Sequence, residues 1–198
     1  VVSFCWAMAV FLGVYTSVKL GGSGHLNPAV TIALAATGAF KSSLVASYLL
    51  AQLAGAFTGA VLVWLTYNKH FEASSDADLK KAIFCTAPAI RSPLHNLITE
   101  FIGTFVLMFG ALAFTPATTS LGTLDALPVT LLVLGIGLSL GGPTGYAINP
   151  ARDLGPRIAH FLLPIPGKRD SDWSYSWIPI VGPIAGALLA AWLFGLLN

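Results

Sequence analysis

Charge is what this sequence has least of. Only 9% of its 198 residues are Asp, Glu, Lys or Arg, whereas 56% are hydrophobic. Soluble domains carry about 25% charged residues, so this composition predicts a protein that lies in a lipid bilayer. The formal net charge is only +2, and no block of basic residues indicates a nucleic acid as partner.

Cysteine is also scarce. Of the two cysteines, Cys5 lies in an apolar run and Cys85 in a polar stretch, which excludes a disulfide framework and a metal-binding spacing. We therefore expect neither a bound metal nor a cofactor. The apolar runs also lack paired carboxylates and any nucleophile with a neighbouring base, so we do not expect an enzyme.

Long apolar runs are what the sequence does have. Five of them predict helices that cross the membrane, at residues 1–18, 44–67, 97–114, 128–140 and 177–197. The pairs Gly55/Gly59 and Gly182/Gly186 have the Gly-x-x-x-Gly spacing that allows two helix backbones to approach closely. The largest polar segment, residues 68–96, is predicted to be an aqueous connecting loop.

One tripeptide occurs twice. Asn27-Pro28-Ala29 recurs as Asn149-Pro150-Ala151, each time after a glycine-rich run. Asn is a preferred residue before the first helical turn, and Pro fits the first helical position. The apolar run after the first copy ends near Gly38, which allows about 15 Å of helix, half of a ~30 Å hydrocarbon core. Each tripeptide therefore predicts a half-membrane helix that is entered through a re-entrant loop.

The two tripeptides indicate an internal repeat. They lie 122 positions apart (149 − 27), so we divide the chain into repeats at residues 1–67 and 97–198, joined by 68–96. The second repeat has two spans before its tripeptide and the first has one, so we expect a further first helix in the native protein. Repeats with three spans each lie in opposite orientations. The two half-helices should then meet N-terminus to N-terminus at the midplane, beside a polar pore.

The residues around the tripeptides resemble those of the aquaporins, or major intrinsic proteins. The similarity rests on GHLNPAVT at 24–31 and GYAINPARDLGPR at 145–157, and extends over nearly the whole chain. It implies an all-α inverted repeat with two re-entrant half-helices. Asp153 directly after Arg152 resembles the glycerol-conducting branch of the family. The resemblance further implies a homotetramer in the cell (plasma) membrane, with one pore in each subunit.

The resemblance also implies a set of pore residues. Four would line the narrowest point: Trp6, Gly137, Tyr146 and Arg152. The glycine-rich run before the first tripeptide holds one residue more than the usual pattern, so Ala7 is the alternative to Trp6. Backbone carbonyls would line the two halves of the pore, those of Ser23, Gly24, His25, Tyr146, Ala147 and Ile148.

Five polar residues have expected roles around this pore. Asn27 and Asn149 should cap their helices and direct their amide N–H groups toward a solute oxygen. An arginine at membrane depth is costly, so we expect Arg152 to have a function there. It should donate hydrogen bonds to the solute and repel cations. Asp153 should brace the loop around Arg152, and Glu100 should accept hydrogen bonds from re-entrant backbone.

The function that these expectations favour is a passive channel. It would conduct glycerol, other small neutral solutes and water, and would exclude protons and ions. One alternative is a secondary transporter, since transporters also use inverted repeats with broken helices, although only Glu100 is available for ion coupling. The other alternative is a channel mainly for water.

Overall fold

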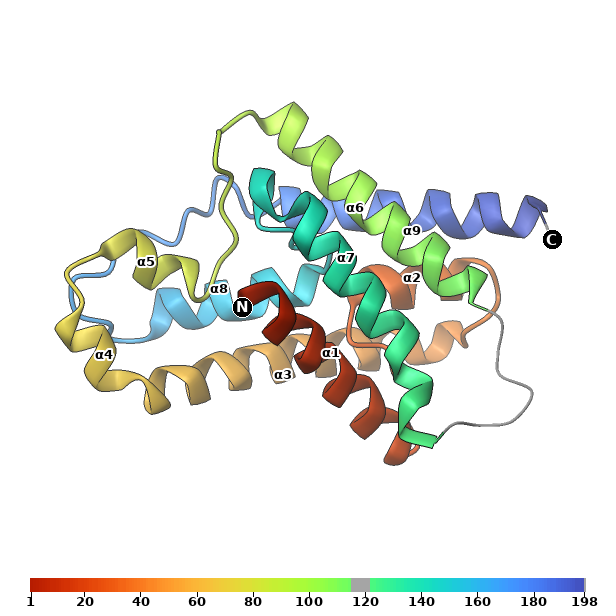
Figure 1. Cartoon of the computed structure of the whole chain (residues 1–198), viewed down its shortest axis with the longest axis horizontal. Coiled ribbons are helices and arrows are strands. Elements are labelled where there is room, and N and C mark those ends of the chain that lie inside the picture. The colour runs from red at the N-terminus through yellow and green to blue at the C-terminus, as the bar shows by residue number, and fades with distance from the viewer. Residues whose placement is uncertain (115–121, 198) are drawn as a thin grey trace.

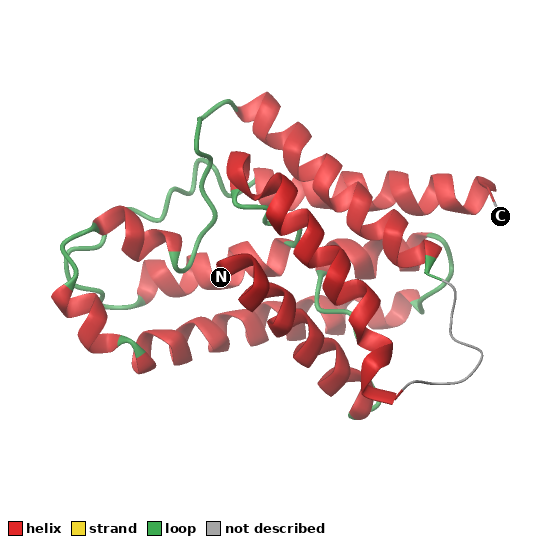
Figure 2. Cartoon of the chain, viewed as in Figure 1, coloured by secondary structure: helices red, strands yellow, loops and turns green. Residues whose placement is uncertain are grey.

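The computed structural model describes residues 1–114 and 122–197, and within these residues it is built from helices and loops (Figures 1 and 2). The long helices are α1 (Val2–Lys19), α3 (Val45–Thr66), α6 (Pro93–Ala113), α7 (Leu127–Thr144) and α9 (Ile178–Leu197). The shorter ones are α2 (Pro28–Ala36), α4 (Asn68–Ala73), α5 (Ala77–Ala82) and α8 (Pro150–Leu162), with 3-10 turns η1 (Ser42–Leu44) and η2 (Gly122–Ala126).

Five of these helices are long and apolar enough to cross a membrane. They are α1, α3 together with η1, α6, α7 together with η2, and α9. The five predicted spans and the all-α membrane fold are thus confirmed.

The two short helices that follow the tripeptides, α2 and α8, hold the two repeats together. Figure 1 shows them between α3 and α9. α2 packs mainly against α9, which is far away in the sequence, and α8 packs mainly against α3. α1 likewise packs against α7, a helix from the other half of the chain. Each half-helix therefore lies against a long helix from the other half of the chain.

Glycines bring some of these helices into close contact. A side chain at Gly186 of α9 would overlap the backbone carbonyl of Phe101 in α6, and one at Gly182 would lie 2.9 Å from the Cβ of Glu100. The second pair therefore packs closely, as predicted. Around Gly55 and Gly59 of α3, in contrast, an added Cβ would meet no heavy atom within 4 Å among the described residues.

Two predicted boundaries were wrong. The span predicted at 128–140 was expected to end before Gly141, but α7 continues to Thr144 and ends at Gly145, whose φ of 75° supplies the left-handed conformation that stops a helix. α6 begins at Pro93, four residues before the predicted start at 97, because Pro is favoured at the first helical position.

The connecting segment 68–96 is also more ordered than a simple aqueous loop. It contains α4 and α5, and the residues after α5 turn back toward the end of α7. There the N–H of Ala89 donates to the carbonyl of Pro143 at 3.0 Å. This return places part of the segment beside the re-entrant loop that precedes α8.

Candidate functional site

Two asparagines begin the half-helices. Oδ1 of Asn27 accepts the backbone N–H of Ala29 at 2.9 Å. Oδ1 of Asn149 accepts the N–H groups of Ala151 at 3.0 Å and Arg152 at 3.2 Å. Both side chains therefore cap their own helices, satisfying backbone donors that have no partner in a first helical turn.

The same two side chains also bond across the repeats. Nδ2 of Asn27 donates to the carbonyl of Ile148 at 2.7 Å, and Nδ2 of Asn149 donates to the carbonyl of Leu26 at 2.8 Å. Each acceptor directly precedes the other asparagine, so the arrangement is reciprocal. It holds the positive ends of α2 and α8 against each other. Because an amide has two N–H donors, only one hydrogen on each asparagine remains for a solute, one fewer than predicted.

The predicted pore carbonyls divide into two groups. That of His25 accepts Nε2 of Gln52 at 2.8 Å, and that of Ile148 accepts the bond from Asn27. The other four receive no hydrogen bond from any described residue: Ser23, Gly24, Tyr146 and Ala147. A carbonyl oxygen with two free lone pairs can accept hydrogens from a passing hydroxyl group.

The loop before Asn149 has a strained backbone. Tyr146 and Ile148 have φ angles of 37° and 42°, and non-glycine residues in this region cost about 1–3 kcal/mol each. Glu100 of α6 holds the loop, since Oε1 accepts the N–H of Ala147 at 2.9 Å and Oε2 that of Ile148 at 2.7 Å. The carboxylate is 1% exposed and therefore binds the re-entrant backbone from the side away from solvent.

The structure brings the four residues predicted for the narrowest point together. Cζ of Arg152 lies 4.2 Å from the centre of the Trp6 ring, within the range of a cation–π contact. Trp6 packs against the buried cluster that contains Tyr146. An added Cβ at Gly137 would lie 2.9 Å from Cζ of Tyr146, so this glycine provides room for the tyrosine ring. Ala7, the alternative to Trp6, is fully buried.

A second arginine on α8 shows how unusual the environment of Arg152 is. Arg157 is fully buried, and all five of its N–H donors have partners. Nε and Nη2 donate to the two carboxylate oxygens of Asp153 at 2.7 and 2.8 Å. The remaining bonds go to the carbonyls of Thr86 at 3.0 Å, Ser171 at 2.6 Å and Asp172 at 3.1 Å.

Arg152 is the opposite case. Its guanidinium makes no hydrogen bond or ion pair with any residue in the described part of the chain, and its observed contact is the ring of Trp6. Its neighbour Asp153 points to the other side, where Oδ2 also accepts the N–H and the hydroxyl of Thr86 at 2.8 and 2.6 Å. The N–H groups of Arg152 are therefore free to bind a solute.

The sequence patterns did not predict three residues that contact this site, which are Arg157, Thr86 and Gln52. Arg157 lies four residues after Asp153 on a predicted helix, and this spacing is a known signal for an ion pair. Thr86 and Gln52 gave no signal, because their partners lie 67 and 27 residues away.

Other chemistry has little support near the site. Among the described residues no three His, Cys, Asp or Glu side chains form a metal-binding group. Burial raises the pKa of the Cys85 thiol to about 12, although the charge of Arg157 acts in the opposite direction. This thiol stays protonated at neutral pH and is a poor nucleophile.

Two half-helices face each other in a bundle of helices long enough to span a membrane, beside carbonyls and an arginine that have no hydrogen-bond partner among the described residues. This arrangement defines a membrane channel. The chain belongs to the major intrinsic protein family, whose model matches residues 1–194.

Similar proteins support this assignment. The probable glycerol uptake facilitator protein of Thermotoga maritima is 55% identical over 98% of this chain and 84% of its own length. The glycerol uptake facilitator protein of Streptococcus pneumoniae strain R6 is 51% identical, over 99% of this chain and 83% of its own. The X-ray structure of the aquaglyceroporin from Plasmodium falciparum superposes with a TM-score of 0.85 at 30% identity, covering 97% of this chain and 79% of the other.

Proposed function

We propose that the protein is a passive channel for glycerol and other small neutral solutes together with water, and that it excludes protons and ions. The main support is the position of Arg152, a half-buried arginine beside the aromatic ring of Trp6, whose guanidinium has no hydrogen-bond partner among the described residues. The names of the bacterial relatives support glycerol as the solute.

The site suits a solute with one polar and one apolar edge. Trp6 and Tyr146 offer apolar ring surface, whereas Arg152 offers N–H donors. Glycerol has a carbon chain along one edge and hydroxyl groups along the other. Its hydroxyls would bind Arg152 and the unpaired carbonyls, and its carbons would lie against the rings. Water gains little from apolar walls, so this arrangement favours glycerol over a channel mainly for water.

Electrostatics supports the exclusion of cations. At about 6 Å and an effective dielectric constant near 20, Arg152 opposes a unit positive charge by roughly 3 kcal/mol. The N-termini of α2 and α8, each about half a charge at ~5 Å, add roughly 1.5 kcal/mol each. The sum of about 6 kcal/mol corresponds to a roughly 10⁴-fold penalty, which a neutral solute does not experience.

We further propose a multi-pass location in the plasma membrane and a homotetramer with one pore per subunit. The five spanning helices and the bacterial relatives support the membrane location. The division into repeats at residues 1–67 and 97–198 belongs to the same proposal. It is supported by the reciprocal bonds of Asn27 and Asn149.

Glycerol flux into proteoliposomes tests the proposal. After a glycerol gradient is imposed, stopped-flow light scattering should show swelling much faster than in empty vesicles, with a rate nearly linear in glycerol concentration. A saturating rate coupled to proton movement would instead indicate a secondary transporter. Swelling no faster than in empty vesicles would contradict a glycerol channel.

Arg152→Val tests the role of the free arginine. Glycerol flux should remain largely intact, while cation leakage should rise by roughly 100-fold, since about 3 kcal/mol of the barrier is lost. Unchanged cation exclusion would show that the helix ends suffice without Arg152.

A further inference from the structure

A single residue of the connecting segment is bound to α8 at three points. Thr86 donates its N–H and its hydroxyl to Oδ2 of Asp153, and its carbonyl accepts Nη2 of Arg157 at 3.0 Å. It is only 5% exposed. Three residues further on, the bond between Ala89 and Pro143 fixes the same stretch to α7. The connecting segment thus contacts α8 directly beside Arg152.

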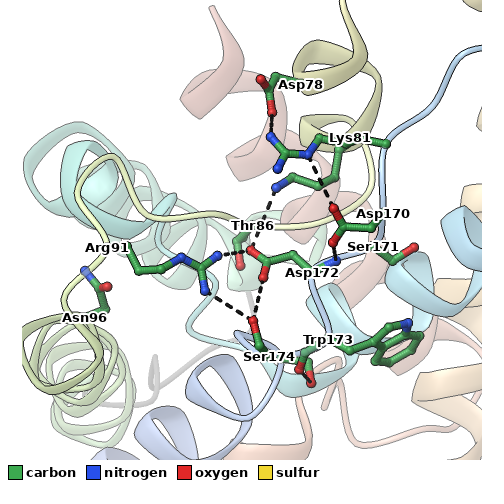
Figure 3. A network of polar contacts seen from close by, with 12 residues as sticks. Asp78, Lys81, Thr86, Arg91, Asn96, Asp170, Ser171, Asp172, Trp173 and Ser174 are labelled. Atoms are coloured by element: carbon green, nitrogen blue, oxygen red, sulfur yellow. Dashed lines mark hydrogen bonds and ion pairs between the residues drawn. The ribbon is translucent and has the colours of Figure 1, made fainter.

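Asp172 lies in the turn between α8 and α9 and has a φ of 52°. Its N–H donates to Oδ1 of Asp170 at 2.8 Å, which stabilises this conformation. Figure 3 shows its carboxylate facing Arg91, Lys81 and Ser174. Arg91 forms an ion pair with Oδ2, Lys81 Nζ lies 3.8 Å from the same oxygen, and the hydroxyl of Ser174 donates to Oδ1 at 3.0 Å.

The carboxylate of Asp172 stays ionised. Burial opposes ionisation, but the hydrogen bonds from Ser174 and Arg91 and the charges of Arg91 and Lys81 outweigh it and lower the pKa of Asp172. The ion pairs therefore tie the turn to the connecting segment. The backbone carbonyls of Ser171 and Asp172 in this turn are the ones that accept Nη1 of Arg157.

These contacts form one continuous path to Arg152. Asp172 holds the turn, the turn holds Arg157, and Arg157 together with Thr86 holds Asp153, which adjoins Arg152 in the first turn of α8. Arg152 has no hydrogen bond of its own to the described residues, so its position depends on the backbone that carries it. Buried ion pairs add little stability over apolar side chains of the same volume, but they hold a fixed geometry.

We propose that Thr86 and Asp172, which are not among the residues expected to line the pore, are positioning residues that fix the guanidinium of Arg152 through Asp153 and Arg157. The proposal rests on the proposed function, in which Arg152 binds the solute and repels cations. It predicts that both residues change the selectivity of folded channels.

Two conservative variants with matched controls test it. Thr86→Val removes the hydroxyl but keeps the size, and Thr130→Val is its control, because that buried hydroxyl donates at 2.8 Å to the carbonyl of Ala126 within its own helix region. Asp172→Asn removes the charge, and Asp78→Asn is its control, because Asp78 forms an ion pair between the same two segments at the exposed surface.

The first measurement is selectivity per folded channel in proteoliposomes. We expect Thr86→Val and Asp172→Asn to raise the ratio of cation leakage to glycerol flux by about 2- to 30-fold, the range typical of residues that act on a site from a distance. Both controls should match the wild type. Ratios equal to the wild type, whatever the thermal stability of the variants, would overturn the proposal. Absence of wild-type glycerol flux would instead contradict the proposed function.

The second measurement needs no transport. Arg152 lies over the ring of Trp6, so in arginine-labelled protein its side-chain NMR signal should carry a ring-current shift that Arg157 and Arg169 lack. Arg91 lies 5.5 Å from the centre of the Tyr175 ring, so the signal of Arg152 is identified by its loss in Arg152→Val. Thr86→Val and Asp172→Asn should reduce this shift, and their controls should not. An unchanged shift in both variants would overturn the positioning role independently of glycerol flux.

Discussion

The two half-helices begin in the same way but are held by different chemistry. In the first repeat, Nε2 of Gln52 donates to the carbonyl of His25 and, at 2.9 Å, to the hydroxyl of Thr31, so the bonds are neutral. In the second repeat, the carboxylate of Glu100 holds the loop, and a buried ion pair holds the helix. The tripeptide thus gives the same helix start in both halves, whereas among the described residues the charged groups that hold a half-helix lie in the half that presents Arg152.

The long helices differ as well. α9 packs closely against α6 through Gly182 and Gly186, whereas the face of α3 with Gly55 and Gly59 meets no other described helix. Three predictions test these two contrasts.

The largest effect is expected where helices touch. Gly186→Val should prevent folding, because even its Cβ would overlap the backbone of Phe101, and backbone cannot move aside as a side chain can. Gly59→Val should be nearly neutral, since the space beside it is open in this chain. Yield and monodispersity in size-exclusion chromatography measure both. Equal damage by both variants would show that another helix packs on this face of α3 in the native protein.

An intermediate loss of stability is expected when the polar side chains that hold the two half-helices are replaced. Arg157→Met leaves the carboxylate of Asp153 buried without its main partner and should destabilise by about 3–5 kcal/mol. Gln52→Met removes only neutral bonds and should cost about 1–2 kcal/mol. Melting curves of the purified proteins in detergent rank the two. If Gln52→Met lowered the melting temperature as much as Arg157→Met, the contrast between neutral and charged contacts at the two half-helices would be wrong.

The smallest expected effect is a change of stability with pH. The pKa of Asp172 is lowered in the folded protein, so its stabilising contribution is present above the pKa of an unfolded Asp, about 3.9, and is lost as the pH falls through the lower folded value. The melting temperatures of wild type and Asp172→Asn should therefore differ at neutral pH and converge in acid. The difference between wild type and Gln52→Met should not change with pH. A constant difference for Asp172→Asn would show that its charge does not contribute.

The fold and the helix starts at the two asparagines could be predicted from the sequence because both depend on local patterns. Apolar runs predicted the five spans, and each Asn-Pro pair predicted a helix start, a matter of neighbouring residues alone. The end of α7 was misplaced because Gly141 and Gly145 are equivalent as residue types, and only Gly145 adopts the left-handed conformation. Thr86 and Asp172 could not be found, since their partners are brought to them by the folding of two separate connecting segments.

The reciprocal bonds of Asn27 and Asn149 make the junction between α2 and α8 depend on both repeats. Each asparagine donates to the carbonyl of the residue that precedes the other asparagine, so neither half-helix is positioned without the other repeat. Moving the two half-helices apart would break both hydrogen bonds at once, so their separation is fixed by two bonds that act together.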